Sequence, residues 1–171
     1  MAAFTDVARA DNSCAMDVSF DYDFDRFVTA QDAVYDDVLR ALRAGRKPNS
    51  KSRNWMWYVF PQIAGLGASQ DAMFYAISDR EEAAAYLAHP TLGPRLAQCT
   101  ALAIEHANNG AEALFGQPDD IKFQASMSLF SRIKSADPIF RHALDVFFGG
   151  VGDQDTLKIL KLAFIATLDA D

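Results

Sequence analysis

The stretch FDRFVTAQDAVYDDVLRAL, residues 24–42, decides the fold class of this chain. Its apolar side chains recur every three or four positions, which is the period of one face of an α-helix. Gly45 follows shortly afterwards, and glycine readily takes the left-handed conformation that ends many helices. The pattern therefore predicts a helix that starts at Phe24, continues to about Leu42 and ends at Gly45.

Similar signals continue along the chain. Ser78 opens a Ser-Asp-Arg-Glu sequence, a capping-box pattern that predicts Ser78 as the N-cap of a helix. Strands have little support, because β-branched runs are scarce and no Asn-Gly or Asp-Gly hairpin turn occurs. Trp55 to Phe60 fits a short helix or a short strand equally well. Further helices are expected over residues 78–87, 93–107 and 111–115, from Pro118 onward, from Pro138 to Gly149, and over 156–168.

These signals predict a mostly α fold, with a single compact multi-helix domain over residues 21–171 and a flexible N-terminal tail over residues 1–20. The chain has 171 residues, of which 50% are hydrophobic, so it can bury a sizeable core. Its net charge of −7 disfavours binding to duplex nucleic acid or an anionic membrane. No apolar run is long enough to span a bilayer, and no secretory signal is evident. We therefore expect a cytoplasmic protein.

The sequence contains no recognisable metal or cofactor motif. Cys14 and Cys99 lack a partner spacing, and the three histidines lie far apart. We therefore expect free thiols, no metal and no cofactor. GxSxG, P-loop and GxGxxG patterns are also missing from the sequence, which leaves serine-hydrolase and kinase chemistry without support.

The segment RALRAGRKPNSKSRNWMWYVFPQ, residues 40–62, reverses the charge of this acidic chain locally. Six cations precede a run of aromatic residues, and no acidic residue occurs between Asp37 and Asp71. Cations beside flat aromatic faces suit a small anionic ligand that contains a ring, such as a nucleotide. We expect Arg46 and Lys47 to hold phosphates, Trp55 or Trp57 to stack on the ring and Gln62 to hydrogen-bond it. Phe60 is a further expected ligand-binding residue. The alternative is that the aromatic run belongs to the hydrophobic core.

The segment KFQASMSLF, residues 122–130, is a second candidate. Lys122 and Ser126 lie one helical turn apart and could hold a phosphate. The alternative is an exposed lysine and a serine that packs between helices. Because neither segment forms a site alone, we predict that they meet in space, with Trp57 and Lys122 less than about 20 Å, or two helix diameters, apart.

Three separated stretches resemble the domain-of-unknown-function family numbered 1810. They read NWMWYVFPQIAGLGAS at 54–69, AYLAHPTLGPRL at 85–96 and FGQPDDIKFQASMSLF at 115–130. The resemblance covers roughly residues 22–160 and implies a single, mostly helical bacterial domain without an established activity. This chain has Asn54 where the family usually has a histidine, and Ala125 where it has a serine. Residues 48–53 look partly inserted.

A more distant similarity points towards chemistry. The order EAAAYL at 82–87, LGPRL at 92–96 and KFQ at 122–124 resembles the NADAR family, which is linked to NAD and ADP-ribose metabolism. It implies an ADP-ribose-like ligand and, as a reaction, hydrolysis of an N-glycosidic bond. Such a reaction needs a carboxylate, and Asp120, Asp71 and Glu82 are the candidates. The competing hypothesis is a non-enzymatic interaction module that uses the aromatic WMWYVFPQ surface.

Overall fold

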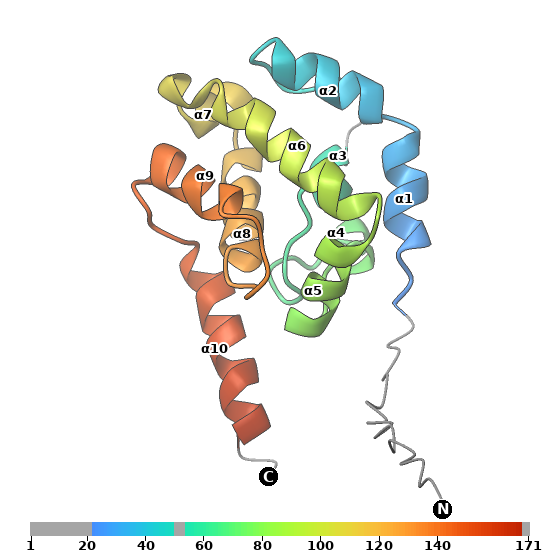
Figure 1. Cartoon of the computed structure of the whole chain (residues 1–171), viewed down its shortest axis with the longest axis vertical. Coiled ribbons are helices and arrows are strands. Elements are labelled where there is room, and N and C mark those ends of the chain that lie inside the picture. The colour runs from blue at the N-terminus through green and yellow to red at the C-terminus, as the bar shows by residue number, and fades with distance from the viewer. Residues whose placement is uncertain (1–21, 50–53, 169–171) are drawn as a thin grey trace, which may run out of the picture.

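The computed structural model describes residues 22–49 and 54–168, the last seven of them without their side chains. The expected tail, Cys14, Lys51 and Arg53 lie outside the described residues. Within them the chain is helical, and the one β-type contact is an isolated parallel bridge between Ile63 and Ile77. The mostly α prediction is thus confirmed (Figure 1). The elements are α1 (Asp25–Asp32), α2 (Tyr35–Arg43), α3 (Trp55–Val59), α4 (Gln70–Phe74), α5 (Arg80–Ala88), α6 (Leu92–Ile104), η2 (Ala107–Asn109), α7 (Ala111–Phe115), α8 (Asp119–Phe130), α9 (Ile139–Phe148) and α10 (Gln154–Leu168).

The helix expected over residues 24–42 is two helices. A turn at Ala33 and Val34 separates α1 from α2, so that the apolar faces of both reach the core. Gly45 ends α2 as predicted, with a φ of 64°. Its amide donates to the carbonyl of Leu42, and the next amide donates to that of Ala41, which is the Schellman arrangement.

The aromatic run forms the short helix α3, which resolves the choice between helix and strand. Helix α4 was not predicted; Ser69 caps it by accepting a hydrogen bond from the amide of Ala72 at 3.1 Å. The capping box before α5 is shifted by one residue. Asp79, rather than Ser78, accepts the bond from the amide of Glu82, at 2.7 Å. A carboxylate is favoured there because it also meets the positive end of the helix.

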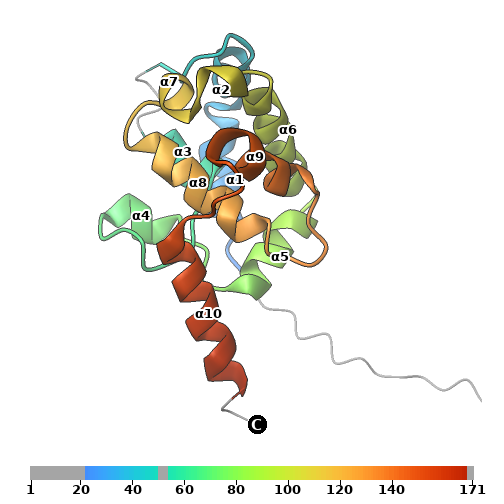
Figure 2. The same cartoon turned by 90° about the vertical axis from the view of Figure 1, so that its left-hand side faces the viewer.

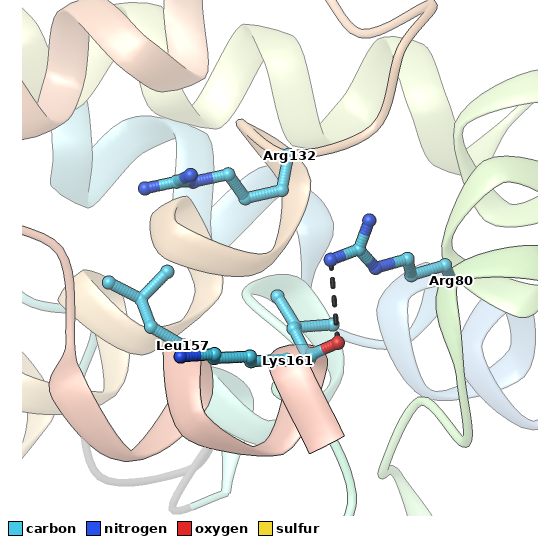
Figure 3. A pocket seen from close by; sticks show the side chains of 5 residues that line it. Arg80, Arg132, Leu157 and Lys161 are labelled. Atoms are coloured by element: carbon cyan, nitrogen blue, oxygen red, sulfur yellow. Dashed lines mark hydrogen bonds between the residues drawn. The ribbon is translucent and has the colours of Figure 1, made fainter. Parts of the chain in front are cut away.

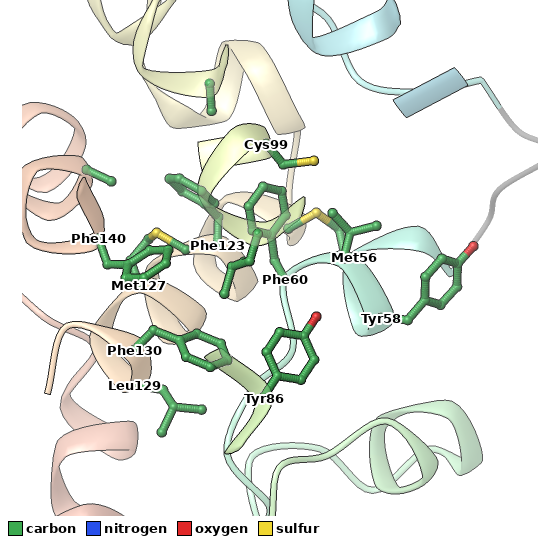
Figure 4. Close-up of a cluster of buried hydrophobic side chains, with 14 of the residues drawn as sticks. Met56, Tyr58, Phe60, Tyr86, Cys99, Phe123, Met127, Leu129, Phe130 and Phe140 are labelled. Atoms are coloured by element: carbon green, nitrogen blue, oxygen red, sulfur yellow. The ribbon is translucent and has the colours of Figure 1, made fainter. Parts of the chain in front are cut away.

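Helix α8 lies at the centre of the domain. Its residues from Ala125 to Phe130 are all buried, as expected for a helix that is covered on every side. Phe123 packs edge-on against Phe60, at 5.0 Å between ring centroids, and lies 4.6 Å from Phe115. Aromatic rings from α3, α7 and α8 thus build one core, part of which Figure 4 shows.

Helix α10 extends away from the other helices (Figures 1 and 2). Its start is held against α8, because the amide of Asp153 donates to Oγ of Ser128 at 2.7 Å. Asp153 also caps the helix by accepting from the amide of Thr156 at 2.8 Å. The first turns of α10 therefore have a fixed position beside α8.

Candidate functional site

The two segments singled out in the sequence meet directly. The Nζ atom of Lys122, in the first turn of α8, lies 4.4 Å from the ring centroid of Trp57 in α3. The same atom lies 2.8 Å from Oδ1 of Asp119. Trp57 is half-buried, and the side chains of Lys122 and Asp119 are each 21% exposed. The predicted proximity is confirmed, as a cation–π contact between residues 65 positions apart in the sequence.

A second lysine approaches the same helix start. A Cβ atom added at Gly116 would lie 3.3 Å from Nζ of Lys47, so this cation reaches the turn that leads into α8. Gly116 has a φ of 74°, which also favours glycine there. Lys47 is exposed, and so is Arg46, which lies in the turn after α2. Lys47 and Lys122 therefore lie near the positive end of α8, where an anion is favoured.

Several predicted contact residues belong to the interior instead. Trp55 is 3% exposed, and Phe60 and Ser126 are fully buried. Gln62 is buried as well. Within the described residues, Nε2 of Gln62 and Oγ of Ser126 have no hydrogen-bond partner. Trp55 and Phe60 therefore support the site from the core, as the alternative interpretation of the aromatic run proposed, and Trp57 is the ring that a ligand can approach.

The candidate carboxylates occupy three different environments. Asp71, in α4, accepts a hydrogen bond from Nδ2 of Asn54 at 2.7 Å. The carbonyl of Asn54 accepts from the amide of Trp57 at 3.0 Å, so Asp71 is tied to the Lys122–Trp57 contact through one residue. Asp120 is half-buried in the first turn of α8. Asp71 is thus linked to the site through Asn54, and Asp120 shares the first turn of α8 with Lys122.

Glu82 is placed elsewhere. It is 3% exposed, and its Oε1 lies 2.7 Å from Nη2 of Arg26. Its other oxygen accepts from the amide of Ser78 at 2.7 Å. Helix α5 packs against the end of α8, where the ring centroids of Tyr86 and Phe130 lie 5.4 Å apart. Phe130 is eight residues, or about 12 Å along the helix axis, from Lys122. These contacts give Glu82 a structural partner and argue against the catalytic role considered from the sequence.

A separate basic cavity was not found by reading the sequence. It has a volume of about 420 Å³ and is lined by Arg80, Arg132, Leu157, Leu160 and Lys161 (Figure 3). Its cations come from α5, from the turn after α8 and from α10, so no local pattern in the sequence joins them. In the sequence, Arg80 is recognisable only as part of a helix start.

The family of the chain follows from comparison with known proteins. The family described as "Protein of unknown function (DUF1810)" matches residues 21–160. The chain belongs to the DUF1810 family. This DUF1810 domain is also similar to a solved structure, described as that of the conserved hypothetical protein Rv1873 from Mycobacterium tuberculosis. The two are 46% identical, with a TM-score of 0.77, and the match covers 82% of this chain and 97% of the other. No curated protein matches the chain.

These relatives carry no stated activity, so the NADAR resemblance stays a prediction. The two departures from the family pattern can now be placed. Asn54 is exposed and donates to Asp71, whereas Ala125 is buried within α8. Of the two, only position 54 can face a ligand.

The described residues of this DUF1810 domain bear on two features: a cluster of metal ligands and a helix that spans a membrane. They contain no group of three or more His, Cys, Asp or Glu side chains that could hold a metal ion. No described helix is long and apolar enough to cross a bilayer. Cys99 is a free, buried thiol.

Proposed function

We propose that this DUF1810 domain binds a small anionic ligand that contains a ring, of the ADP-ribose class, beside Lys122 and Trp57. The observation that carries the proposal is the cation of Lys122 on the indole face of Trp57, at 4.4 Å. Lys47 supports it, because this second cation reaches the same end of α8. Together they offer charge for a phosphate and a flat surface for a ring.

Binding requires Lys122 to leave the indole face, and the cost of this is small. A cation–π contact contributes about 0.5–1 kcal/mol when exposed and about 2 kcal/mol when desolvated, and an exposed ion pair contributes about 0–1 kcal/mol. The side chain of Lys122 is 21% exposed, so its contacts lie between the exposed and the desolvated case. A charge-assisted hydrogen bond to phosphate contributes about 1.5–3 kcal/mol and offsets both losses. The flexible lysine stem lets Nζ turn towards a phosphate while the ring of the ligand takes its place on Trp57.

We propose cleavage of an N-glycosidic bond as the reaction, with Asp71 or Asp120 as the carboxylate that activates water or stabilises the developing positive charge on the sugar. Asp71 is held in place by Asn54 at 2.7 Å. Glu82 is the weakest candidate, because turning it towards a substrate would leave the guanidinium of Arg26 without its buried partner.

The second candidate function is protein interaction, at a different surface from the one expected. In the aromatic run only Trp57 is half-buried and the other rings are buried, so the run offers a partner little area. Helix α4 instead exposes two large apolar side chains, with Met73 60% and Phe74 55% exposed. Exposed apolar neighbours of this kind are typical of contact surfaces.

Calorimetry with ADP-ribose tests the ligand proposal. We expect binding to wild-type protein, and a loss of affinity below about 3 kcal/mol in Lys122→Ala, which is the phosphate contact less the contacts that Lys122 gives up on binding. Trp57→Ala should also weaken binding. Lys158→Ala is the matched control, because Lys158 pairs with Asp155 three residues earlier, at 3.0 Å, as Lys122 does with Asp119. No heat at millimolar ADP-ribose would remove the nucleotide proposal and leave α4 as the leading site. Binding that survives both site substitutions would place the ligand elsewhere.

The reaction has its own test. Wild-type protein incubated with NAD should release nicotinamide, measured by liquid chromatography, and Asp71→Asn or Asp120→Asn should abolish the release. Asn54→His restores the residue that the family usually has beside Asp71, and comparing its rate with wild type shows whether this position limits turnover. If ADP-ribose binds but no nicotinamide appears with either protein, the domain binds the ligand without cleaving it.

A further inference from the structure

The cavity at the root of α10 gathers positive charge in an acidic chain. Arg80 is the first residue of α5, Arg132 follows α8, and Lys161 lies in α10. Figure 3 shows Arg132 and Lys161 on either side of Leu157, with Arg80 reaching in from α5. The five described residues that line the cavity are cationic or apolar, so none of them supplies a carboxylate that would neutralise it.

None of the three cations is paired within the described residues. The ion pairs there involve Arg26, Arg40, Arg95, Lys122, Arg141 and Lys158. Arg80 donates one long hydrogen bond, from Nη2 to the carbonyl of Leu160 at 3.4 Å. Its Nε is buried and has no partner in the described residues. Buried donors are normally satisfied, so this N–H is a donor that the described residues leave without an acceptor.

The position of Arg80 strengthens this argument. A cation in the first turn of a helix faces the positive end of the helix dipole, which is unfavourable for stability. Asp79 caps the same helix end, and its carboxylate accepts hydrogen bonds from the amide of Glu82 and the hydroxyls of Tyr22 and Ser78. Stability of α5 therefore gives no reason for an arginine here, whereas an anion in the cavity does.

The shape of the cavity selects the kind of anion. Its volume of about 420 Å³ lies within the range of small-molecule sites and exceeds what a bare ion fills. Leu157 and Leu160 provide an apolar wall beside the cations. A phosphate has three oxygens that can each meet a different cation, and arginine forks suit them. Extended polyanions are disfavoured by the net charge of −7 on the chain.

We propose that this cavity is a second ligand site, which binds a small organic phosphate with its phosphate between Arg80, Arg132 and Lys161 and its apolar part against Leu157. The site is separate from the surface at Lys122 and Trp57 and does not depend on the function proposed there.

Phenyl phosphate is the probe, titrated into ¹⁵N-labelled full-length protein and followed by NMR and calorimetry. We expect the Nε–H signal of Arg80, identified by its loss in Arg80→Lys, to shift on binding. Arg132→Gln and Lys161→Gln should each weaken binding roughly tenfold, because each removes a charge-assisted contact of at least about 1.4 kcal/mol. Both side chains are exposed, so their replacement should leave the fold intact.

Two exposed lysines outside the cavity provide matched controls. Lys134→Gln lies two residues from Arg132, and Lys158→Gln lies one turn before Lys161 on α10; each removes the same charge and should leave binding unchanged. Inorganic phosphate should bind more weakly than phenyl phosphate. Equal affinity for the two would overturn the apolar part of the proposal.

Three results would overturn the site itself. The first is no shift and no heat at tens of millimolar phenyl phosphate. The second is equal weakening by the cavity variants and the control variants. The third is binding that is lost in Lys122→Ala but retained in Arg132→Gln and Lys161→Gln, which would move the phosphate to the other surface and leave this cavity unused.

Discussion

Arg26 and Glu82 form a buried ion pair, with Nη2 and Oε1 2.7 Å apart, that joins α1 to α5. The side chains are 12% and 4% exposed, and each has a second hydrogen bond: Arg26 donates to the carbonyl of Ala76 at 3.1 Å, and Glu82 accepts from the amide of Ser78 at 2.7 Å. Removing one partner leaves the other buried without compensation. This pair makes Glu82 part of the framework of the fold.

We therefore expect Glu82→Ala to lower the free energy of unfolding by about 3–5 kcal/mol, the usual cost of breaking a buried pair from one side. Urea denaturation followed by circular dichroism measures this. Asp37→Ala is the control, because Asp37 and Arg40 form an exposed pair whose loss should cost less than about 1 kcal/mol. Equal effects of the two substitutions would show that the Arg26–Glu82 pair is not the structural contact described above.

The observed N-cap of α5 predicts that Asp79 contributes more to stability than its neighbour Ser78. Asp79→Ala should destabilise the domain by about 1 kcal/mol, because it removes the acceptor of the Glu82 amide and a negative charge at the helix start. Ser78→Ala should cost less, since the side chain of Ser78 bonds only to Asp79, at 3.0 Å. Thermal unfolding of both variants compares them. A larger loss for Ser78→Ala would restore the cap expected from the sequence.

The aromatic core predicts a strong packing effect. Phe123→Ala should lower the free energy of unfolding by about 3–5 kcal/mol, because it leaves a cavity beside Phe60, which follows α3, and Phe115 of α7. Phe74→Ala removes a ring that is 55% exposed and should change stability little. Urea denaturation measures both, and a similar loss in the two variants would contradict the central position of Phe123.

Stability should fall in alkaline solution. Burial raises the pKa of the Cys99 thiol from 9.0 to about 12, and burial raises the pKa of Tyr58 from 10.0 to about 12. Above pH 9 the unfolded chain releases these protons while the folded chain keeps them, so the unfolded state is favoured. Stability is thus unaffected by these groups below pH 9 and declines between pH 9 and 12.

Urea denaturation at a series of pH values measures this decline. Cys99→Ala should make the slope between pH 9 and 10 shallower, because the thiol titrates first. The Cys99 thiol should also resist a thiol reagent until the protein unfolds, in a Cys14→Ser background that leaves one cysteine. Rapid reaction in the folded state would contradict the burial of Cys99.

Charge should make this protein bind a small anion such as ADP-ribose but not an extended nucleic acid. The affinity for ADP-ribose should fall as salt rises, because half-exposed cations bind it and salt screens them. Duplex DNA should not bind at physiological ionic strength, since the chain as a whole carries a net charge of −7 and repels it. Fluorescence anisotropy with labelled DNA tests the second part, and saturable DNA binding would contradict it.

Local sequence patterns predicted most helix positions, because the spacing of apolar residues and the positions of glycine and proline determine where a helix forms and ends within a few residues. The helix end at Gly45 and the helix α7 illustrate this. Local patterns failed where the same residues fit two structures equally well. At Ala33 and Val34 the apolar spacing of a helix continues, although the helix itself is interrupted by a turn. The cap at Asp79 was missed for the same reason: Ser78 and Asp79 are both good N-caps, and the position of the chain beside Arg26 and Glu82 chose between them.

Sequence patterns predicted a helical chain, a resemblance to the DUF1810 family, and the segments 40–62 and 122–130 as the two parts of one candidate site. Only the tertiary structure decided which aromatic rings face the core, since Trp55 and Trp57 look alike in the sequence but differ in burial. It also paired Glu82 with Arg26 and brought Arg80, Arg132 and Lys161 around one cavity. Periodicity records the side of a helix on which a residue lies, whereas contacts between distant segments depend on how the helices pack, and no local pattern encodes that.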